Sequence, residues 1–160
     1  MNPNDRVLRR SVLDRLVQSG EPEPRNWYES VRALKAAVLR DIEWLLNTRR
    51  VIEPAGDALP ELQQSVYHYG LPDVTSLSTD STSARKQLLR RVETTIELFE
   101  PRLTSVRVIE AVTEGETGRH VRFVVEGLLR LHPDPEPIAF DTIMEAGTGR
   151  FSVSGGSSAG

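Results

Sequence analysis

Apolar residues recur at helical spacing in three stretches of the chain ahead of Pro101. The spacing predicts a short helix over residues 6–17, a long helix over residues 29–48 and a third helix over residues 84–99. The three apolar stripes comprise Leu8, Val12, Leu13 and Leu16, then Val31, Leu34, Val38, Ile42 and Leu45, and last Leu88, Val92, Ile96 and Phe99. Each predicted helix is therefore amphipathic, with one face that packs against other parts of a protein.

Beyond Pro101 the apolar pattern changes to a period of two, which is typical of half-buried strands. The alternation predicts strands over residues 104–113, 120–131, 137–145 and 150–153. Short turns rich in glycine or proline separate these strands, so neighbouring strands run antiparallel. Helices followed by strands predict an α+β fold, in which the N-terminal helices pack on one face of a small antiparallel meander sheet.

Segments rich in proline, glycine and serine connect these elements. Pro22 and Pro24 end the first helix and extend the chain after it. Residues 51–83 are typical of a long irregular connection, with a short helix around residues 60–66. The apolar stripe of the first helix either folds back onto its own domain or docks on a partner, and the sequence leaves both possibilities open.

Length and composition fit one domain with short extensions. The chain has 160 residues, of which 38% are hydrophobic, a low value for a fully packed domain. We predict three parts: an N-terminal helix and proline-rich linker over residues 1–24, a main domain over residues 25–153, and a flexible Ser/Gly tail over residues 154–160.

Charge and cysteine content exclude several classes of protein. A net charge of -3 argues against a general nucleic-acid binder, and the lack of cysteine excludes disulfide scaffolds and thiolate chemistry. No apolar run reaches the roughly 20 residues of a membrane-spanning helix, and the N-terminus has no apolar signal segment, so we expect a cytoplasmic protein. Only Lys35 and Lys86 among the 20 basic residues are lysine. This arginine excess reflects either codon usage or the arginine content of protein interfaces.

The sequence offers no pattern typical of catalysis. Its three histidines, His68, His120 and His132, come without a Gly-x-Ser-x-Gly elbow and without the spacing of metal ligands. There is no glycine-rich phosphate loop, and no pair of carboxylates stands in an apolar setting. We therefore predict no catalytic, cofactor-binding or metal-binding residue.

Glu100, Pro101 and Arg102 form a corner between the third helix and the first strand. The proline ring fixes the backbone there, with one charge on each side. One interpretation is a helix stop with a local ion pair, worth at most about 1 kcal/mol when exposed. The other is that both charges point outward and bind another chain. Physical considerations alone favour the first interpretation.

Five short motifs, in order along the chain, resemble the TssE family of type VI secretion baseplate subunits. They are residues 11–16 (SVLDRL), 45–50 (LLNTRR), 69–73 (YGLPD), 100–103 (EPRL) and 136–142 (EPIAFDT). The fourth motif also matches the Glu-Pro-Arg signature of the lysozyme-like baseplate wedge family of contractile phage tails. TssE-like proteins also resemble the phage sheath initiator. The resemblance extends from residue 11 to about residue 153.

The resemblance implies a structural baseplate subunit that needs no cofactor. Such a subunit lies at the inner face of the cytoplasmic membrane, binds TssF and TssG beneath TssK, and initiates the TssB–TssC sheath. The late strands would template the sheath by strand addition at an exposed edge, at residues 138–144 or 151–153. The corner would hold the subunit to the wedge core. The predicted partner-binding residues are Glu100, Pro101, Arg102, Leu13, Asp14, Arg15, Leu16, Ile138 and Phe140.

Two other functions remain as alternatives to the baseplate subunit. One is a peptidoglycan-cleaving, lysozyme-like enzyme, which would clear a suspension of cell-wall sacculi. The other is an anti-adaptor or regulatory binding protein on the same fold, which would capture partners other than baseplate proteins.

Overall fold

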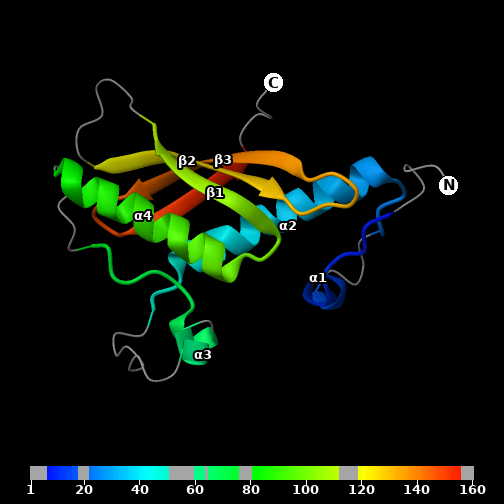
Figure 1. Ribbon diagram of the computed structural model, residues 1–160, viewed down its shortest axis with the longest axis horizontal. Coiled ribbons are helices and arrows are strands. Elements are labelled where there is room, and N and C mark those ends of the chain that lie inside the picture. The colour runs from blue at the N-terminus through cyan, green and yellow to red at the C-terminus, as the bar shows by residue number, and fades with distance from the viewer. Residues whose placement is uncertain are drawn as a thin grey trace. The chain divides into compact units, whose positions relative to one another are not determined.

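The computed structural model describes residues 7–17, 22–50, 60–63, 65–75, 81–111 and 119–155, and the chain divides into two compact units, Met1–Val38 and Leu39–Gly160. The helices are α1 (Val12–Val17), α2 (Trp27–Asn47), α3 (Pro60–Gln63) and α4 (Thr82–Phe99), with a short 3₁₀ helix, η2, at Val66–His68. The strands are β1 (Leu103–Glu110), β2 (His120–Leu129), β3 (Glu136–Glu145) and β4 (Arg150–Gly155) (Figure 1). Within these described ranges, every helix is too short or too polar to cross a membrane.

In the first unit, α1 begins at Val12. The apolar spacing predicted a start at residue 6. Ser11 explains the start at Val12. Its hydroxyl accepts a hydrogen bond from the backbone N–H of Asp14 at 3.0 Å and donates one to the Asp14 carboxylate at 2.7 Å. This reciprocal cap satisfies an N–H group that the first helical turn leaves unpaired, so the helix starts directly after the serine.

A similar cap sets the start of α2. The side-chain oxygen of Asn26 accepts a hydrogen bond from the backbone N–H of Glu29 at 2.9 Å, and the Glu29 carboxylate accepts one from the backbone N–H of Arg25 at 2.8 Å. The helix therefore starts at Trp27, two residues before the predicted start.

In the second unit, the four strands form one antiparallel sheet in the order β1-β2-β3-β4. The register pairs Val125 with Val108 on one side and with Phe140 on the other. Each strand pairs with its neighbour in sequence, so the predicted α+β meander is confirmed. The glycine turn predicted between the first two strands falls on residues 112–118, which lie outside the described residues.

One face of the sheet forms the core of this unit. Burial alternates along β2 and β3, as the period of two had predicted. The buried hydrophobic residues of the sheet are Leu103, Val106, Val121, Phe123, Val125, Leu129, Ile138, Phe140, Met144 and Phe151. α4 lies along β1 and adds its own buried stripe, which consists of Leu88, Leu89, Val92 and Ile96 (Figure 1).

β1 contains an irregularity that the alternating pattern did not predict. The register shifts in the middle of the strand, where Ser105 has a positive φ of 53°. The shift is a β-bulge, in which an extra residue of one strand has no partner. Gly127 lies opposite the bulge, where an added Cβ would stand 3.4 Å from the carbonyl oxygen of Thr104. Because of the bulge, Leu103 and Val106 are both buried although they are three residues apart.

Candidate partner-binding site

The predicted corner is a tight turn between α4 and β1. The backbone N–H of Glu100 donates to the carbonyl of Ile96 at 2.8 Å and closes the last turn of α4. The backbone N–H of Leu103 then donates to the carbonyl of Glu100 at 3.1 Å. Pro101, between them, is exposed and has no N–H to continue the helix, so the chain leaves α4 here.

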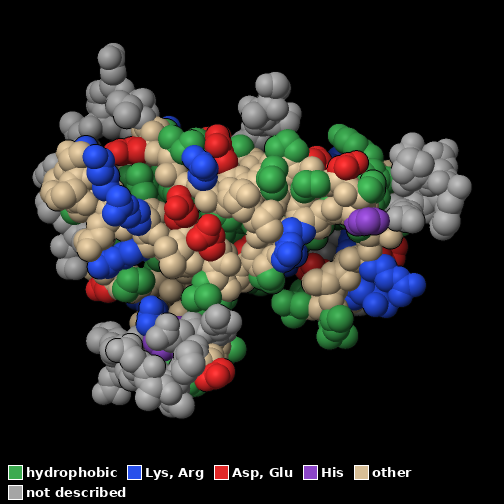
Figure 2. Space-filling view, viewed as in Figure 1, with side chains coloured by type: hydrophobic (Ala, Val, Ile, Leu, Met, Phe, Trp, Pro, Cys, Tyr) green, Lys and Arg blue, Asp and Glu red, His purple; other side chains and the backbone are tan. Residues whose placement is uncertain are grey.

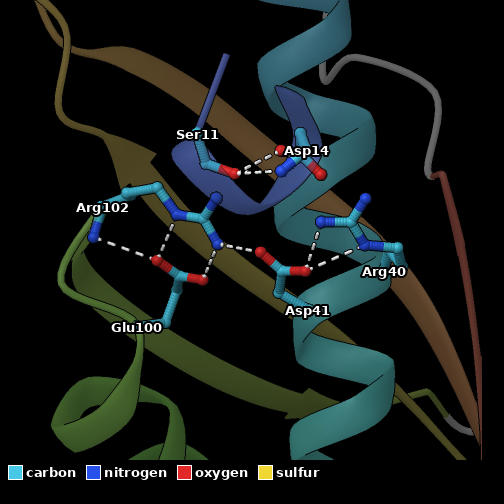
Figure 3. Close-up of polar contacts among 6 residues, drawn as sticks. All are labelled: Ser11, Asp14, Arg40, Asp41, Glu100 and Arg102. Carbon is cyan, nitrogen blue, oxygen red and sulfur yellow. Dashed lines mark hydrogen bonds and ion pairs between the residues drawn. The ribbon is translucent and has the colours of Figure 1, made fainter. Parts of the chain in front are cut away.

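The Glu100 side chain points inward, and only 5% of it is exposed. Its Oε1 accepts hydrogen bonds from Arg102 Nε at 2.6 Å and from the Arg102 backbone N–H at 3.1 Å. Its Oε2 accepts a hydrogen bond from Nη2 of Arg102 (Figure 3). The expectation that both charges of the corner point outward is therefore wrong for Glu100.

Asp41 on α2 extends this pair into a chain of four charges. Its Oδ2 accepts a hydrogen bond from Arg102 Nη2 at 2.7 Å, and its Oδ1 accepts from Nη2 and Nε of Arg40 at 2.7 and 3.0 Å (Figure 3). We call Arg40, Asp41, Glu100 and Arg102 the corner cluster. The Glu100 hydrogen bond, and after it the Asp41 contact, raise the pKa of Arg102, so this guanidinium stays charged.

Arg102 keeps one donor group that the cluster does not use. Its Nε and Nη2 atoms donate to Glu100 and Asp41, whereas Nη1 donates to no residue in the described ranges. The side chain is 29% exposed. The cluster therefore fixes the orientation of the guanidinium while two N–H groups remain for a carboxylate or carbonyl of another chain.

Tyr69 lies beside the corner cluster. Its ring contacts Phe99, the last residue of α4, edge to face, with 5.4 Å between the ring centroids. Burial raises the pKa of Tyr69, and the negative charges of Asp41 and Glu100 raise it further. The phenol is therefore neutral, and it adds aromatic packing to the charges of the corner.

The loop that follows Tyr69 is fastened to the end of α2. The backbone N–H of Leu71 donates to the carbonyl of Thr48 at 2.9 Å, and the backbone N–H of Arg50 donates to the carbonyl of Leu71 at 2.9 Å. Arg49 Nη1 forms an ion pair with Asp73 at 3.0 Å. The second and third sequence motifs, which are far apart in the chain, thus contact each other through hydrogen bonds and an ion pair.

Ile138 and Phe140 lie on β3, which is an interior strand. β3 pairs with β2 on one side and with β4 on the other, and the two side chains are 9% and 0% exposed. A strand that is paired on both sides offers no free backbone groups to an added strand. The expectation of an exposed edge at residues 138–144 is therefore wrong, and the edge strands are β1 and β4.

Side chains of α2 cover the edge of β4. The Asn47 side chain donates to the carbonyl of Phe151 at 2.8 Å and accepts from the backbone N–H of Phe151 at 2.9 Å. One helical turn earlier, the Glu43 carboxylate accepts a hydrogen bond from the backbone N–H of Val153 at 3.4 Å. Residues 151–153 do lie on an edge strand, but these side chains occupy backbone groups that an added strand would need.

The residues predicted on α1 differ in exposure. Leu13, Arg15 and Leu16 are exposed, whereas Asp14 is buried and takes part in the cap with Ser11. Asp14 therefore stabilises the start of the helix. Leu13, Arg15 and Leu16 are the predicted residues of α1 that are exposed.

Sequence reasoning missed Arg40 and Asp41, and it named Tyr69 only as part of the motif at residues 69–73. Asp41 is one of 23 acidic residues, and its partner Arg102 is 61 positions away along the chain. A single sequence holds no signal for a contact of that range. In the described part of the chain, no three potential metal ligands come together.

A model of the baseplate wedge protein gp25 family matches residues 32–134. The chain belongs to this family. The match includes the corner cluster and the loop at residues 69–73. It confirms the resemblance to the wedge family that the motifs had indicated. Members of the gp25 family are described as baseplate wedge proteins. The matched range leaves out α1.

The gp25 family chain is also similar to a chain in a solved structure titled "The baseplate complex from the type VI secretion system". The two are 18% identical with a TM-score of 0.48, and the alignment covers 70% of this chain and 94% of the other. A search of curated proteins gave no match.

Proposed function

We propose that this gp25 family protein is the TssE-type subunit of a type VI secretion baseplate. Its membership of the baseplate wedge family carries the proposal. The five ordered motifs, which resemble TssE, support a type VI system over a phage tail. In this role the protein is structural and not enzymatic, lies on the cytoplasmic side of the membrane, binds TssF and TssG beneath TssK, and initiates the TssB–TssC sheath.

The corner cluster supplies the contact with the wedge core in this proposal. Glu100 and Asp41 act as positioning residues, because they hold the guanidinium of Arg102 in one orientation. The unused Nη1 group of Arg102 donates to a carboxylate or carbonyl of the partner, beside the exposed ring of Pro101. A guanidinium that is already fixed loses little conformational entropy on binding, which favours affinity.

Strand addition at β4 would require a rearrangement of α2 side chains. Asn47 and Glu43 must release Phe151 and Val153 before a sheath strand can pair with this edge. Sheath initiation in this proposal is therefore coupled to the end of α2.

Arg102→Lys tests the role of the corner. Lysine keeps the positive charge but lacks the planar guanidinium. The guanidinium can donate to Glu100 and Asp41 at the same time and still has N–H groups left for a partner. We expect the full-length variant, co-expressed with TssF and TssG, to bind them at least about tenfold more weakly than the wild type in size-exclusion chromatography and titration.

Arg90→Lys is the matched control. Arg90 is exposed on α4, and the variant makes the same change from arginine to lysine. The control should bind as the wild type does. If Arg102→Lys bound TssF and TssG as tightly as the wild type does, the corner would not be part of the interface. Failure of the wild type to bind TssF and TssG would overturn the proposed function itself.

A further inference from the structure

Four large apolar side chains on α1 are exposed. Val12, Leu13, Leu16 and Val17 are 72%, 54%, 73% and 74% exposed, and we call them the α1 apolar surface. They form two pairs at a spacing of four residues, so the members of each pair are neighbours on the helix. Figure 2 shows hydrophobic side chains at the surface where Figure 1 draws α1, with Lys and Arg side chains beside them.

Exposure of this kind is unusual in a short helix. Isolated helices shorter than about 12–15 residues are marginal in water, and the stability of such helices comes from packing of their apolar face. α1 has six residues, and the cap between Ser11 and Asp14 stabilises its first turn. The helix is therefore started by its cap, and most of the surface of its apolar side chains remains exposed.

The charge next to the α1 apolar surface is positive. Arg9 and Arg15 are exposed, whereas Asp14, the acid of this segment, is buried and hydrogen-bonded to Ser11. Arg10 is already bonded within this segment, where its Nη2 donates to the carbonyl of Pro22 at 3.1 Å. A complementary surface would be apolar at its centre and acidic at its rim.

We propose that α1 docks, through its apolar surface, into a groove of a partner protein that has an apolar floor and an acidic rim. This inference rests on the proposed function, since it takes the partner to be another subunit of the same baseplate. The mode is that of a short amphipathic helix in a groove, in which residues at i, i+1, i+4 and i+5 are the anchors. The gp25 family match covers residues 32–134 and does not include α1.

A groove suits this helix better than a membrane surface does. Helices that lie in the membrane interface usually carry tryptophan or phenylalanine on the apolar face, and many span 20–30 residues. The six residues of α1 include no aromatic residue. They rise about 9 Å along the helix axis, which is enough for a pocket but buries little area in a bilayer.

The test compares the full-length double variant Leu13→Glu/Leu16→Glu with the wild type in binding to co-expressed TssF and TssG. We expect binding about 100-fold weaker, because each buried leucine contributes a factor of roughly ten. Val66→Glu is the control: this valine is 88% exposed on η2, outside α1, and the change likewise replaces an exposed apolar side chain by glutamate. The control should bind as the wild type does.

Several results would overturn the inference. Wild-type binding by the double variant, with weakened binding by Arg102→Lys, would remove α1 from the interface while the proposed function stands. A melting temperature more than about 5 °C below that of Val66→Glu would show that α1 packs on its own chain. A wild-type dimer that the double variant abolishes would identify a second copy as the partner. Wild-type sedimentation with phosphatidylglycerol vesicles, lost in the double variant, would identify a membrane.

Discussion

Glu100 is a buried carboxylate whose charge is fully matched by one neighbour. Only 5% of its side chain is exposed, and Arg102 supplies two side-chain donors and a backbone N–H. A buried charge is stable only when it is paired and hydrogen-bonded. The sequence indicated the pair but assigned it the low value of an exposed contact, because burial of Glu100 depends on distant segments that a short motif does not contain.

Arg102→Ala should therefore destabilise the protein without unfolding it. We expect the free energy of unfolding to fall by about 2–4 kcal/mol, since the change leaves the buried Glu100 carboxylate without its partner. Adding Glu100→Gln should restore part of the loss, because a neutral amide needs no counter-charge. Urea unfolding followed by circular dichroism measures both effects. A loss below about 0.5 kcal/mol would contradict this account of the pair.

Asp73 gives a prediction that depends on pH. Hydrogen bonds from the backbone N–H and hydroxyl of Thr75, and then the charge of Arg49, lower the pKa of Asp73. Because the folded state favours the charged carboxylate, its stabilising effect is complete above the ordinary pKa of 3.8 and is lost as the pH falls through the lower folded value.

Asp73→Asn should melt about 2–4 °C below the wild type at pH 7, because the amide keeps an acceptor for Thr75 but loses the charge. The difference in melting temperature should shrink steadily as the pH is lowered from 4 to 2.5. Thermal melts across this range provide the measurement. A difference that does not change with pH would mean that charge has no part in this loop.

α2 and β4 run beside each other with nearly matched spacing. Glu43 and Asn47 are four residues apart on the helix, which is about 6 Å along its axis. Phe151 and Val153 are two residues apart on the strand, which is about 6.8 Å. The helix can therefore place one polar side chain beside each strand residue whose backbone N–H points away from β3, as the observed hydrogen bonds show.

Asn47→Leu should open the edge of β4. Leucine has a similar size but no polar group, so the N–H and carbonyl of Phe151 lose their partner, and we expect a loss of about 1–3 kcal/mol in the free energy of unfolding. The freed edge should also pair between molecules, which light scattering would detect as aggregation that rises with concentration. Asn47→Asp keeps the acceptor for the Phe151 N–H, so its loss should be smaller. Equal stability of all three proteins would show that the edge does not depend on Asn47.

The predicted elements were confirmed where a periodic pattern fixed them, and the differences have local causes. The strands over β2 and β3 agree with their predicted ranges within two residues, because a clean alternation of apolar and polar residues marks them. The first helix is shorter than predicted because Ser11 caps it, and β1 departs from alternation because of the bulge at Ser105. The predicted meander order already places the third strand between the second and the fourth, so the expectation of an exposed edge at residues 138–144 disagreed with the predicted topology.

Within the second unit, hydrogen bonds link three segments that are distant in the sequence: the loop at residues 69–73, the end of α2 and the turn between β3 and β4. The loop exchanges backbone hydrogen bonds with Thr48 and Arg50 at the end of α2. Arg49 adds bonds to Asp73 in the loop and, at 3.4 Å, to the carbonyl of Thr148 in the turn between β3 and β4. The motifs indicated the end of α2 and the loop separately, but the contact between them became visible only in the fold. The packing of this unit thus depends on a loop that has no regular secondary structure.

Gly70→Ala tests this dependence. Gly70 has a φ of +103°, and an added Cβ would lie 2.2 Å from the carbonyl oxygen of Thr48, which is backbone and cannot turn away. Strained backbone and a close contact together should lower the free energy of unfolding by about 2–4 kcal/mol. The methyl group should also push the loop away from Thr48, so the amide of Leu71 should lose protection from hydrogen exchange.

Gly147→Ala is the matched control, because nothing lies within 4 Å of an added Cβ at that turn. It should change the free energy of unfolding by no more than about 0.5 kcal/mol. If Gly70→Ala were as stable as Gly147→Ala, the loop would be able to move away at no cost. The stability of this unit would then not depend on the hydrogen bond between Leu71 and Thr48.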